Sequence, residues 1–355
     1  MTNVNPVLVE AWRGPQVESF HRGAYAVVDG DGVLVASAGD IERPVYPRSA
    51  NKLLQALPLV ESGAADRFGL SDEELALACA SHEGEPEHTR SAASMLAKAG
   101  LDEGVLECGT HWPYAETARR ALAAAGAEPS ALHNNCSGKH AGFICLGCML
   151  AGSRDPRAFL AGYVTPEHPV MREVNAAIEA TTGWRLAGAP RGTDGCSIPT
   201  YGIPLTHLAH GFARLATGVG LPPLRAAAAR RLRAAVARAP FMVGGSARFD
   251  TRVMSLFGER VFCKVGAEGM YCAALPEAGL GIALKMDDGN NARACEVAIA
   301  ALLEAWAPGR DAAQTALLAQ LSDVTLRNWR GLEVGRLAAS ATLRTLGSPT
   351  NPPRA

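Results

Sequence analysis

A serine and a lysine three residues apart stand where the chain leaves its first β-rich region. Ser49 follows the turn-forming Pro47, and apolar residues after it, among them Leu53 and Leu57, recur at helical spacing. This pattern predicts a helix that begins close to Ser49. Residues three apart share one face of a helix, so we expect the Lys52 amine beside the Ser49 hydroxyl, and N-H groups at the helix start can receive a developing anion. Such a pair is a nucleophile with a base within reach.

Lysine is scarce in this chain, and its scarcity favours a chemical role for the pair. A Ser-x-x-Lys alone is common at helix N-caps and on solvated surfaces. Arginine can serve wherever only a positive charge is wanted, whereas a buried lysine amine can lose its proton and act as a base or a metal ligand. The surviving lysines are therefore enriched in candidates for chemistry. Only five of the 34 basic residues are lysines: Lys52, Lys98, Lys139, Lys264 and Lys285.

Two further polar segments hold chemically useful groups. Ser81 and His82 close a predicted helix ahead of Glu83-Gly84-Glu85-Pro86, a pattern that is also typical of an exposed helix end. Cys136 and Lys139 stand three apart at another predicted helix start. This second segment resembles a phosphate loop only superficially, because it lacks the glycine pattern and follows no strand.

A loop farther along the chain adds a second thiol and a carboxylate, Cys196 and Asp194. Together with Cys136 and Lys139 they would suit a tetrahedral zinc ion, although spacing alone favours two unrelated small cysteines. Cys145-x-x-Cys148 lies in an apolar helical run, where core packing is expected. Lys264 interrupts a β-rich run, so it either snorkels from an edge strand or points into a cleft.

Composition excludes several classes of function. The chain has 355 residues, 48% of them hydrophobic, and a net charge of -1, without a run of like charges that would indicate a nucleic-acid or membrane surface. A small neutral or zwitterionic ligand fits better. The N-terminus lacks a secretory pattern, and the longest apolar stretch, 141–152, is too short to span a bilayer. Nine cysteines in such a chain indicate reduced thiols and a cytoplasmic location.

Short β-rich runs stand at both ends of the chain, with helical segments between them. This order predicts an α/β fold with one antiparallel sheet flanked by helices, closed by pairing an N-terminal hairpin with the late strands. We expect one catalytic domain over 1–347 and a flexible tail over 348–355. The expected strands are 7–11, 24–28, 33–38, 260–265, 270–275 and 280–285, and the expected helices include 49–62, 71–80, 87–99, 115–125 and 291–306, with a Gly- and Pro-rich loop over 187–204.

Five motifs together resemble one enzyme family. They are Pro47-Arg48-Ser49-x-x-Lys52, Cys79-Ala80-Ser81-His82, Cys136-Ser137-Gly138-Lys139-His140, Gly192-Thr193-Asp194-Gly195-Cys196 and Lys264-x-Gly266. In this order they resemble the Rhizobium etli type, or class 3, L-asparaginases. The resemblance covers most of the chain and is weakest after Ala307. It implies an α/β/α sandwich with a central antiparallel sheet, as in serine β-lactamases and glutaminases, and a homodimer.

The resemblance also implies residue roles. It pairs Ser49 with Lys52 and Ser81 with Lys264 as catalytic groups, and gives Arg48, His82 and Asp194 to substrate binding or to support of the site. Zinc would be held by Cys136, Lys139 and Cys196, near the substrate and without activating water.

The expected reaction is hydrolysis of L-asparagine to L-aspartate and ammonia through a serine acyl-enzyme. Two alternatives stay open from the sequence. One is a glutaminase or penicillin-recognising hydrolase on the same fold. The other is a zinc-stabilised binding module whose serines are inert.

Overall fold

The structure is a computed structural model that describes residues 4–346, and these residues form two compact units. The first unit comprises 4–50, 203–220 and 260–346, and the second comprises 51–202 and 221–259. Each unit therefore draws on segments that are far apart in the sequence. The expected single domain over 1–347 stays a prediction, and the expected flexible tail, 348–355, lies outside the described residues.

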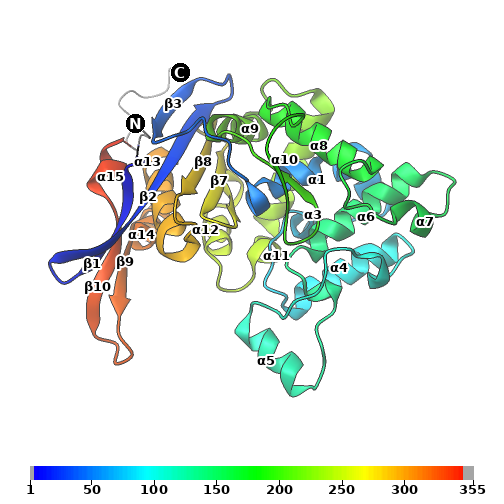
Figure 1. Cartoon of the computed structure of the whole chain (residues 1–355), viewed down its shortest axis with the longest axis horizontal. Helices are drawn as coiled ribbons and strands as arrows, with labels where there is room; N and C mark the ends of the chain where they lie inside the picture. The colour runs from blue at the N-terminus through cyan, green and yellow to red at the C-terminus, as the bar shows by residue number, and fades with distance from the viewer. Residues whose placement is uncertain (1–3, 347–355) are drawn as a thin grey trace. The chain divides into compact units, whose positions relative to one another are not determined.

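The first unit contains a large antiparallel sheet (Figure 1). Its strand order is β6-β7-β8-β2-β1-β10-β9, and β3 pairs with β2 off this path. The strands are β1 Val7–Arg13, β2 Gln16–Asp29, β3 Leu34–Ala38, β6 Phe262–Gly266, β7 Met270–Leu275, β8 Leu280–Met286, β9 Asp323–Arg327 and β10 Glu333–Ala339.

The sheet closes as the sequence predicted. Strands β2 and β3 form the expected hairpin, and β2 pairs antiparallel with β8, from Gly23 opposite Met286 to Asp29 opposite Leu280. Strands β9 and β10 were not predicted, and β10 pairs with β1 at the other side of the sheet. Strand β2 also begins earlier than expected, because its polar first half pairs with β1 in a long hairpin.

Helices of the first unit pack on this sheet. Helix α9 contacts β2, β7 and β8, and α13 contacts β1 and β10. The prediction of a mixed α/β structure around an antiparallel sheet is thus confirmed. The helices are α9 Leu205–Thr217, α13 Glu296–Trp306, α14 Ala312–Ser322 and α15 Ala341–Leu346, with a π-helical turn η5 over Asn291–Cys295 ahead of α13.

The second unit is mainly helical, and α1 contacts α6, α8 and α10 within it. A capping box formed by Ser71 and Glu74 begins α3, which the sequence predicted over 71–80. The helices are α1 Lys52–Glu61, α2 Ala64–Arg67, α3 Asp72–Ala78, α4 Pro86–Lys98, α5 Glu116–Ala124, α6 Ser137–Ala151, α7 Pro156–Leu160, α8 Pro169–Thr182, α10 Pro223–Arg238, α11 Phe241–Gly244 and α12 Phe249–Phe257. Short 3-10 turns are η1 Arg48–Asn51, η2 Glu103–Val105, η3 Ala131–His133 and η4 Gly258–Arg260.

The first predicted helix starts later than expected. The α-helix begins at Lys52, and Ser49 lies in the preceding 3-10 turn η1. The turn is closed by a hydrogen bond from the Ala50 N-H to the Pro47 carbonyl, and Arg48 has φ +51°. This hydrogen bond spans three residues, as in a 3-10 turn, so the α-helix starts only after the turn.

The expected loop over 187–204 contains a small hairpin. Strand β4 Arg191–Thr193 pairs antiparallel with β5 Pro199–Tyr201. Three-residue strands carry too few side chains to give an alternating pattern, so the sequence indicated only the loop.

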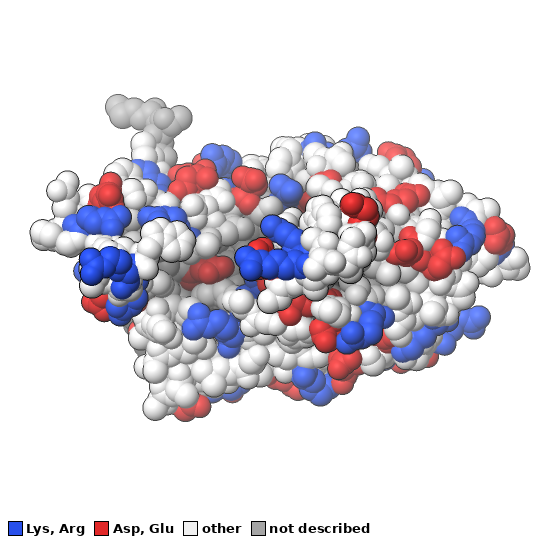
Figure 2. All heavy atoms as spheres, turned by 90° about the horizontal axis from the view of Figure 1, so that it is seen from below, with Lys and Arg blue, Asp and Glu red and all other residues white. Residues whose placement is uncertain are grey.

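No helix among the described residues is long and apolar enough to cross a membrane. On the face shown in Figure 2, basic and acidic side chains are interspersed, and neither sign covers a continuous area. This agrees with a net charge of -1 spread over the chain.

Candidate active site

The Lys52 amine lies among three polar groups of the second unit. Its Nζ contacts the Ala80 carbonyl oxygen, the Ser81 Oγ at 2.9 Å and the Cys136 Sγ at 3.1 Å. The Lys52 side chain is 1% exposed, so water does not compete for the amine. The structure therefore pairs Lys52 with Ser81, a contact that the sequence did not predict.

A close helix contact brings these groups together. A Cβ at Gly138, in the first turn of α6, would lie 2.5 Å from the Leu77 carbonyl oxygen near the end of α3. Only glycine allows this approach, which sets the start of α6 beside the segment that follows α3. Backbone hydrogen bonds fix that segment: the Ser81 N-H donates to the Val243 carbonyl, and the His82 N-H to the Asn135 carbonyl.

His82 is fully buried, and both of its ring nitrogens are used inside the protein. The Gly84 N-H donates to Nδ1 at 3.1 Å, so Nε2 carries the proton and donates to the Ser137 Oγ at 2.9 Å. Ser137 in turn donates to the Leu132 carbonyl at 2.8 Å. Burial lowers the pKa of His82 well below its ordinary value, so the ring is neutral. His82 thus holds the Ser81 segment and has no nitrogen left for a substrate, contrary to one of its two expected roles.

The three expected zinc ligands also come together in the second unit. The Lys139 Nζ donates to the Cys196 Sγ at 3.0 Å, and the Cys136 and Cys196 side chains share a hydrogen bond. All three side chains are buried. Asp194 lies in the same turn as Cys196 and acts electrostatically on Lys139.

The two thiols differ in acidity. The hydrogen bond from Cys196 lowers the pKa of Cys136 well below its ordinary range, assisted by the charges of Lys52 and Lys139. The same hydrogen bond, together with burial, raises the pKa of Cys196. Burial lowers the pKa of Lys139, but Cys196, Cys136 and Asp194 outweigh it and raise that pKa overall. The metal-free protein therefore favours a Cys136 thiolate close to the Lys139 ammonium.

Two sulfurs and one nitrogen are donor types that suit zinc, so the residues present fit this metal by their chemistry. Among residues 4–346, no three His, Cys, Asp or Glu side chains form a group that could hold a metal ion. A zinc site at this place would thus need Lys139 as its third protein donor.

In the first unit, the turn with Ser49 packs against the end of β6. A Cβ at Gly266 would lie 2.5 Å from the Pro47 carbonyl oxygen and 3.1 Å from the Ala50 nitrogen, so glycine is required here. Lys264 stands two residues earlier on β6 and is completely buried, with its Nζ 2.9 Å from the Val265 carbonyl oxygen. It does not snorkel to solvent.

The positive φ of Arg48 places an unfavourable backbone conformation directly before Ser49. Such conformations cost about 1–3 kcal/mol and concentrate at functional sites. Ser49 and Lys264 belong to the first unit and Lys52 and Ser81 to the second, so the pairs Ser49 with Lys52 and Ser81 with Lys264 stay predictions.

The family model of L-asparaginase II matches residues 9–339. The chain belongs to the L-asparaginase II family. Membership makes this protein an amidohydrolase, as predicted. No curated protein matches the chain.

Solved structures similar to this L-asparaginase II family member include a β-lactamase from Mycobacterium bovis, with 14% identity over 84% of this chain and 94% of that chain and a TM-score of 0.38. Another is Mglu in its native form in the presence of 4.3 M NaCl, with 16% identity over 85% of this chain and 60% of that chain and a TM-score of 0.35.

The sequence analysis gave no role to Ser137, which supports the site of this family member. Ser137 follows Cys136 at the start of α6, and a serine at a helix start is typical of a cap. The structure shows instead that its hydroxyl joins His82 to the Leu132 carbonyl. A signal was available in the neighbouring Gly138, because a glycine inside an apolar helical run often marks a close backbone contact.

Proposed function

We propose that this protein hydrolyses L-asparagine to L-aspartate and ammonia through a serine acyl-enzyme. Family membership supports the amide substrate. The observation that carries the serine mechanism is the buried Lys52 amine, 2.9 Å from the Ser81 Oγ. A hydroxyl in contact with a desolvated amine is the arrangement from which a serine nucleophile is activated or a proton is relayed.

Acylation begins at Ser49 in this proposal. Neutral Lys52 takes the Ser49 proton, and the Ser49 oxygen attacks the side-chain carbonyl carbon of asparagine. The resulting oxyanion needs backbone N-H donors near Ser49. The Ala50 N-H is committed to the Pro47 carbonyl, so it is an unfavourable donor. When the tetrahedral intermediate collapses, the amide nitrogen takes the proton that Lys52 holds and leaves as ammonia, and a β-aspartyl ester of Ser49 remains.

Deacylation returns the enzyme to its first state. Water attacks the ester carbonyl carbon and loses its proton to the site, and aspartate leaves as Ser49 regains its hydroxyl proton. The contact between Lys52 and the Ser81 hydroxyl supports Ser81 as the group through which this proton passes. Lys264, buried on β6, is the second candidate amine for this step.

Zinc would be held by Cys136, Lys139 and Cys196, where it supplies a fixed positive charge that orients the substrate. Asp194 would support these ligands, as its electrostatic effect on Lys139 suggests. Arg48 is the remaining candidate for binding the substrate carboxylate, because His82 has both nitrogens occupied. A homodimer and a cytoplasmic location remain further parts of this proposal.

Ammonia release from asparagine and from glutamine tests the substrate, and acid-quenched mass spectrometry tests the intermediate. We expect the aspartyl group on wild-type protein and neither this group nor turnover with Ser49→Ala. Ser153→Ala, which changes an exposed serine, is the matched control and should behave as wild type. Near-normal turnover in Ser49→Ala would refute Ser49 as the nucleophile. Loss of the acyl group in Ser81→Ala but not in Ser49→Ala would give that role to Ser81. Faster hydrolysis of glutamine than of asparagine would refute L-asparagine as the preferred substrate.

A further inference from the structure

A loop directly ahead of α5 contacts both segments that hold the Lys52 amine. We call residues 111–115 the support loop, and none of them belongs to the catalytic or zinc set. Pro113 and Ala115 are buried, His111 is half-buried, and the other two residues are exposed. The support loop and Lys52 both belong to the second unit.

His111 accepts a hydrogen bond from the backbone of the segment that carries Cys136. The Asn135 N-H donates to the His111 Nε2 at 2.8 Å. The ring proton is therefore on Nδ1, which donates to the Trp112 carbonyl at 2.7 Å. The ring also stacks on Tyr114, with the two ring centroids 4.7 Å apart. Because both nitrogens are in use, His111 has none left for a substrate.

Asn135 joins this imidazole to two side chains that contact the Lys52 amine. The Asn135 carbonyl accepts the His82 N-H at 3.2 Å, and Asn135 directly precedes Cys136. Ser81 directly precedes His82. The Ser81 Oγ and the Cys136 Sγ both contact the Lys52 Nζ. A shift of Asn135 would therefore disturb two neighbours of the amine at once.

The other end of the support loop contacts the turn at Glu83 and Gly84. The Ala115 N-H donates to the Glu83 carbonyl at 3.0 Å. Gly84 has φ +75°, and a Cβ there would lie 3.1 Å from the Pro113 Cβ. Glycine at this position allows both the positive φ and the close packing of the loop. The support loop is thus fixed to both segments that adjoin the amine.

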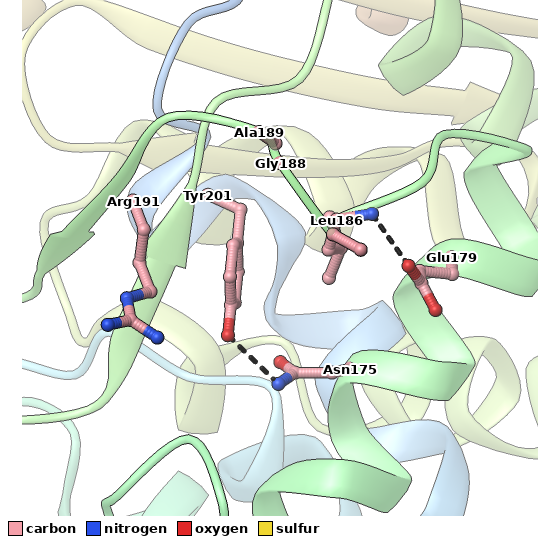
Figure 3. A pocket seen from close by; sticks show the side chains of 8 residues that line it. Asn175, Glu179, Leu186, Gly188, Ala189, Arg191 and Tyr201 are labelled. Carbon is pink, nitrogen blue, oxygen red and sulfur yellow. Dashed lines mark hydrogen bonds between the residues drawn. The ribbon is translucent and has the colours of Figure 1, made fainter.

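Cys196 is positioned by a different part of the unit. It lies between β4 and β5, and the Asn175 Nδ2 of α8 donates to the Tyr201 hydroxyl of β5 at 3.1 Å (Figure 3). This contact ties the small hairpin to α8, whereas the support loop is tied to Asn135. A change at His111 should therefore act first on the Asn135 segment.

We propose that His111 is a positioning residue for the Lys52 amine and acts through the Asn135 peptide. This inference rests on the proposed function, because the position of the amine affects turnover only if the amine takes part in the chemistry. On one side of Asn135 the imidazole holds the Cys136 thiol in place, and on the other side the Ser81 hydroxyl. A misplacement of about 1 Å can cost about 10²-fold in rate, so the loss of this support should be measurable in kcat.

Two substitutions separate the two hydrogen bonds of His111. The longer side chain in His111→Gln can accept from the Asn135 N-H. The shorter side chain in His111→Asn can donate to the Trp112 carbonyl but cannot reach Asn135. We expect kcat for ammonia release to fall by about ten-fold or more in His111→Asn, with a smaller change in KM, and to be largely restored in His111→Gln. Tyr114→Phe keeps the stacked ring of an exposed residue, so it is the matched control and should behave as wild type.

Hydrogen exchange, measured by mass spectrometry of peptides, tests the link from His111 to the Ser81 segment without activity. His111→Asn should speed exchange in 134–136 and also in 81–83, while β7 in the other unit stays unchanged, and His111→Gln should exchange as wild type. Unchanged exchange at 81–83 in His111→Asn would overturn the link whatever the activity.

The kinetic outcomes distinguish this inference from the proposed function. A wild-type kcat in His111→Asn, or equal losses of kcat in the two His111 variants, would overturn positioning through Asn135. If wild-type protein releases no ammonia from asparagine, the proposed function is refuted instead, and hydrogen exchange still decides whether His111 holds the Ser81 segment.

Discussion

Removal of the Ser137 hydroxyl should destabilise the protein and slow catalysis together. This hydroxyl accepts from His82 Nε2 at 2.9 Å and donates to the Leu132 carbonyl at 2.8 Å. Ser137 and His82 are completely buried, and Leu132 is half-buried. Ser137→Ala therefore leaves one buried N-H and one carbonyl without their partner.

The two losses differ in size. An unsatisfied buried polar group costs about 1–3 kcal/mol, and the imidazole N-H has no access to water. The Leu132 carbonyl belongs to a half-buried residue and can recover part of its loss through water. We therefore expect Ser137→Ala to lower the free energy of unfolding by about 2–4 kcal/mol in total.

Urea unfolding at neutral pH measures the stability change, and ammonia release well below the unfolding midpoint measures catalysis of the folded protein. We expect kcat to fall more than KM rises, because His82 adjoins Ser81 and His82 has no free nitrogen for the substrate. Ser153→Ala should stay within about 0.5 kcal/mol of wild type, as surface substitutions do. A Ser137→Ala protein of wild-type stability would refute the assigned hydrogen-bond chain, and unchanged kcat in the folded variant would refute its link to Ser81.

Three other outcomes are expected. Lys52→Arg and Lys264→Arg should each lose most activity in ammonia-release assays, by about 10²–10⁴-fold if the amine acts as a base, since arginine cannot deprotonate; near-normal rates in both would contradict this. Chelation of purified protein should mainly raise the asparagine concentration for half-maximal rate, whereas complete loss of turnover at saturating asparagine would indicate a zinc hydrolase. Burial lowers the pKa of His82, His88 and His140, so unfolding takes up protons as the pH falls below 6.5. Between pH 6.5 and about 5.5 the free energy of unfolding, measured with urea, should fall by about 1 kcal/mol each for His82 and His140, whose pKa is lowered most, and by less for His88. A flat profile would exclude neutral rings at these positions.

The sequence predicted those parts of the fold whose side chains repeat regularly. Strands β6, β7 and β8 and the capped helix α3 have clear β-rich runs or capping signals, and their bounds fall within a few residues of those expected. Strand β10 was not predicted from the sequence, because it is only partly buried and its Gly335 and Arg336 interrupt the apolar pattern. Its place is decided by pairing with β1, which lies more than 300 residues earlier in the chain.

The site was predictable in its residue types and less so in its contacts. Scarcity of lysine pointed to Lys52 and Lys264, and both amines are buried. Spacing predicted Ser49 as the neighbour of Lys52, but the amine also reaches Ser81, which is distant in sequence. That contact depends on the approach of α6 to α3 at Gly138, a tertiary feature that no local pattern contains.

The Ser-Lys pair and the expected zinc ligands meet at one atom, and this decides how the metal should be tested. The Cys136 Sγ lies 3.1 Å from the Lys52 Nζ and also shares a hydrogen bond with Cys196. Cys136→Ser would remove a zinc donor and disturb Lys52 at once, so its activity does not isolate the metal. Cys196 accepts a hydrogen bond from Lys139 and reaches Lys52 only through Cys136, so Cys196→Ser removes a zinc donor with less disturbance of the Lys52 amine. We therefore expect both variants to lose zinc in elemental analysis, but only Cys136→Ser to lower kcat as well as raise KM. Equal kinetic losses in the two variants would mean that the thiol next to Lys52 matters only through the metal.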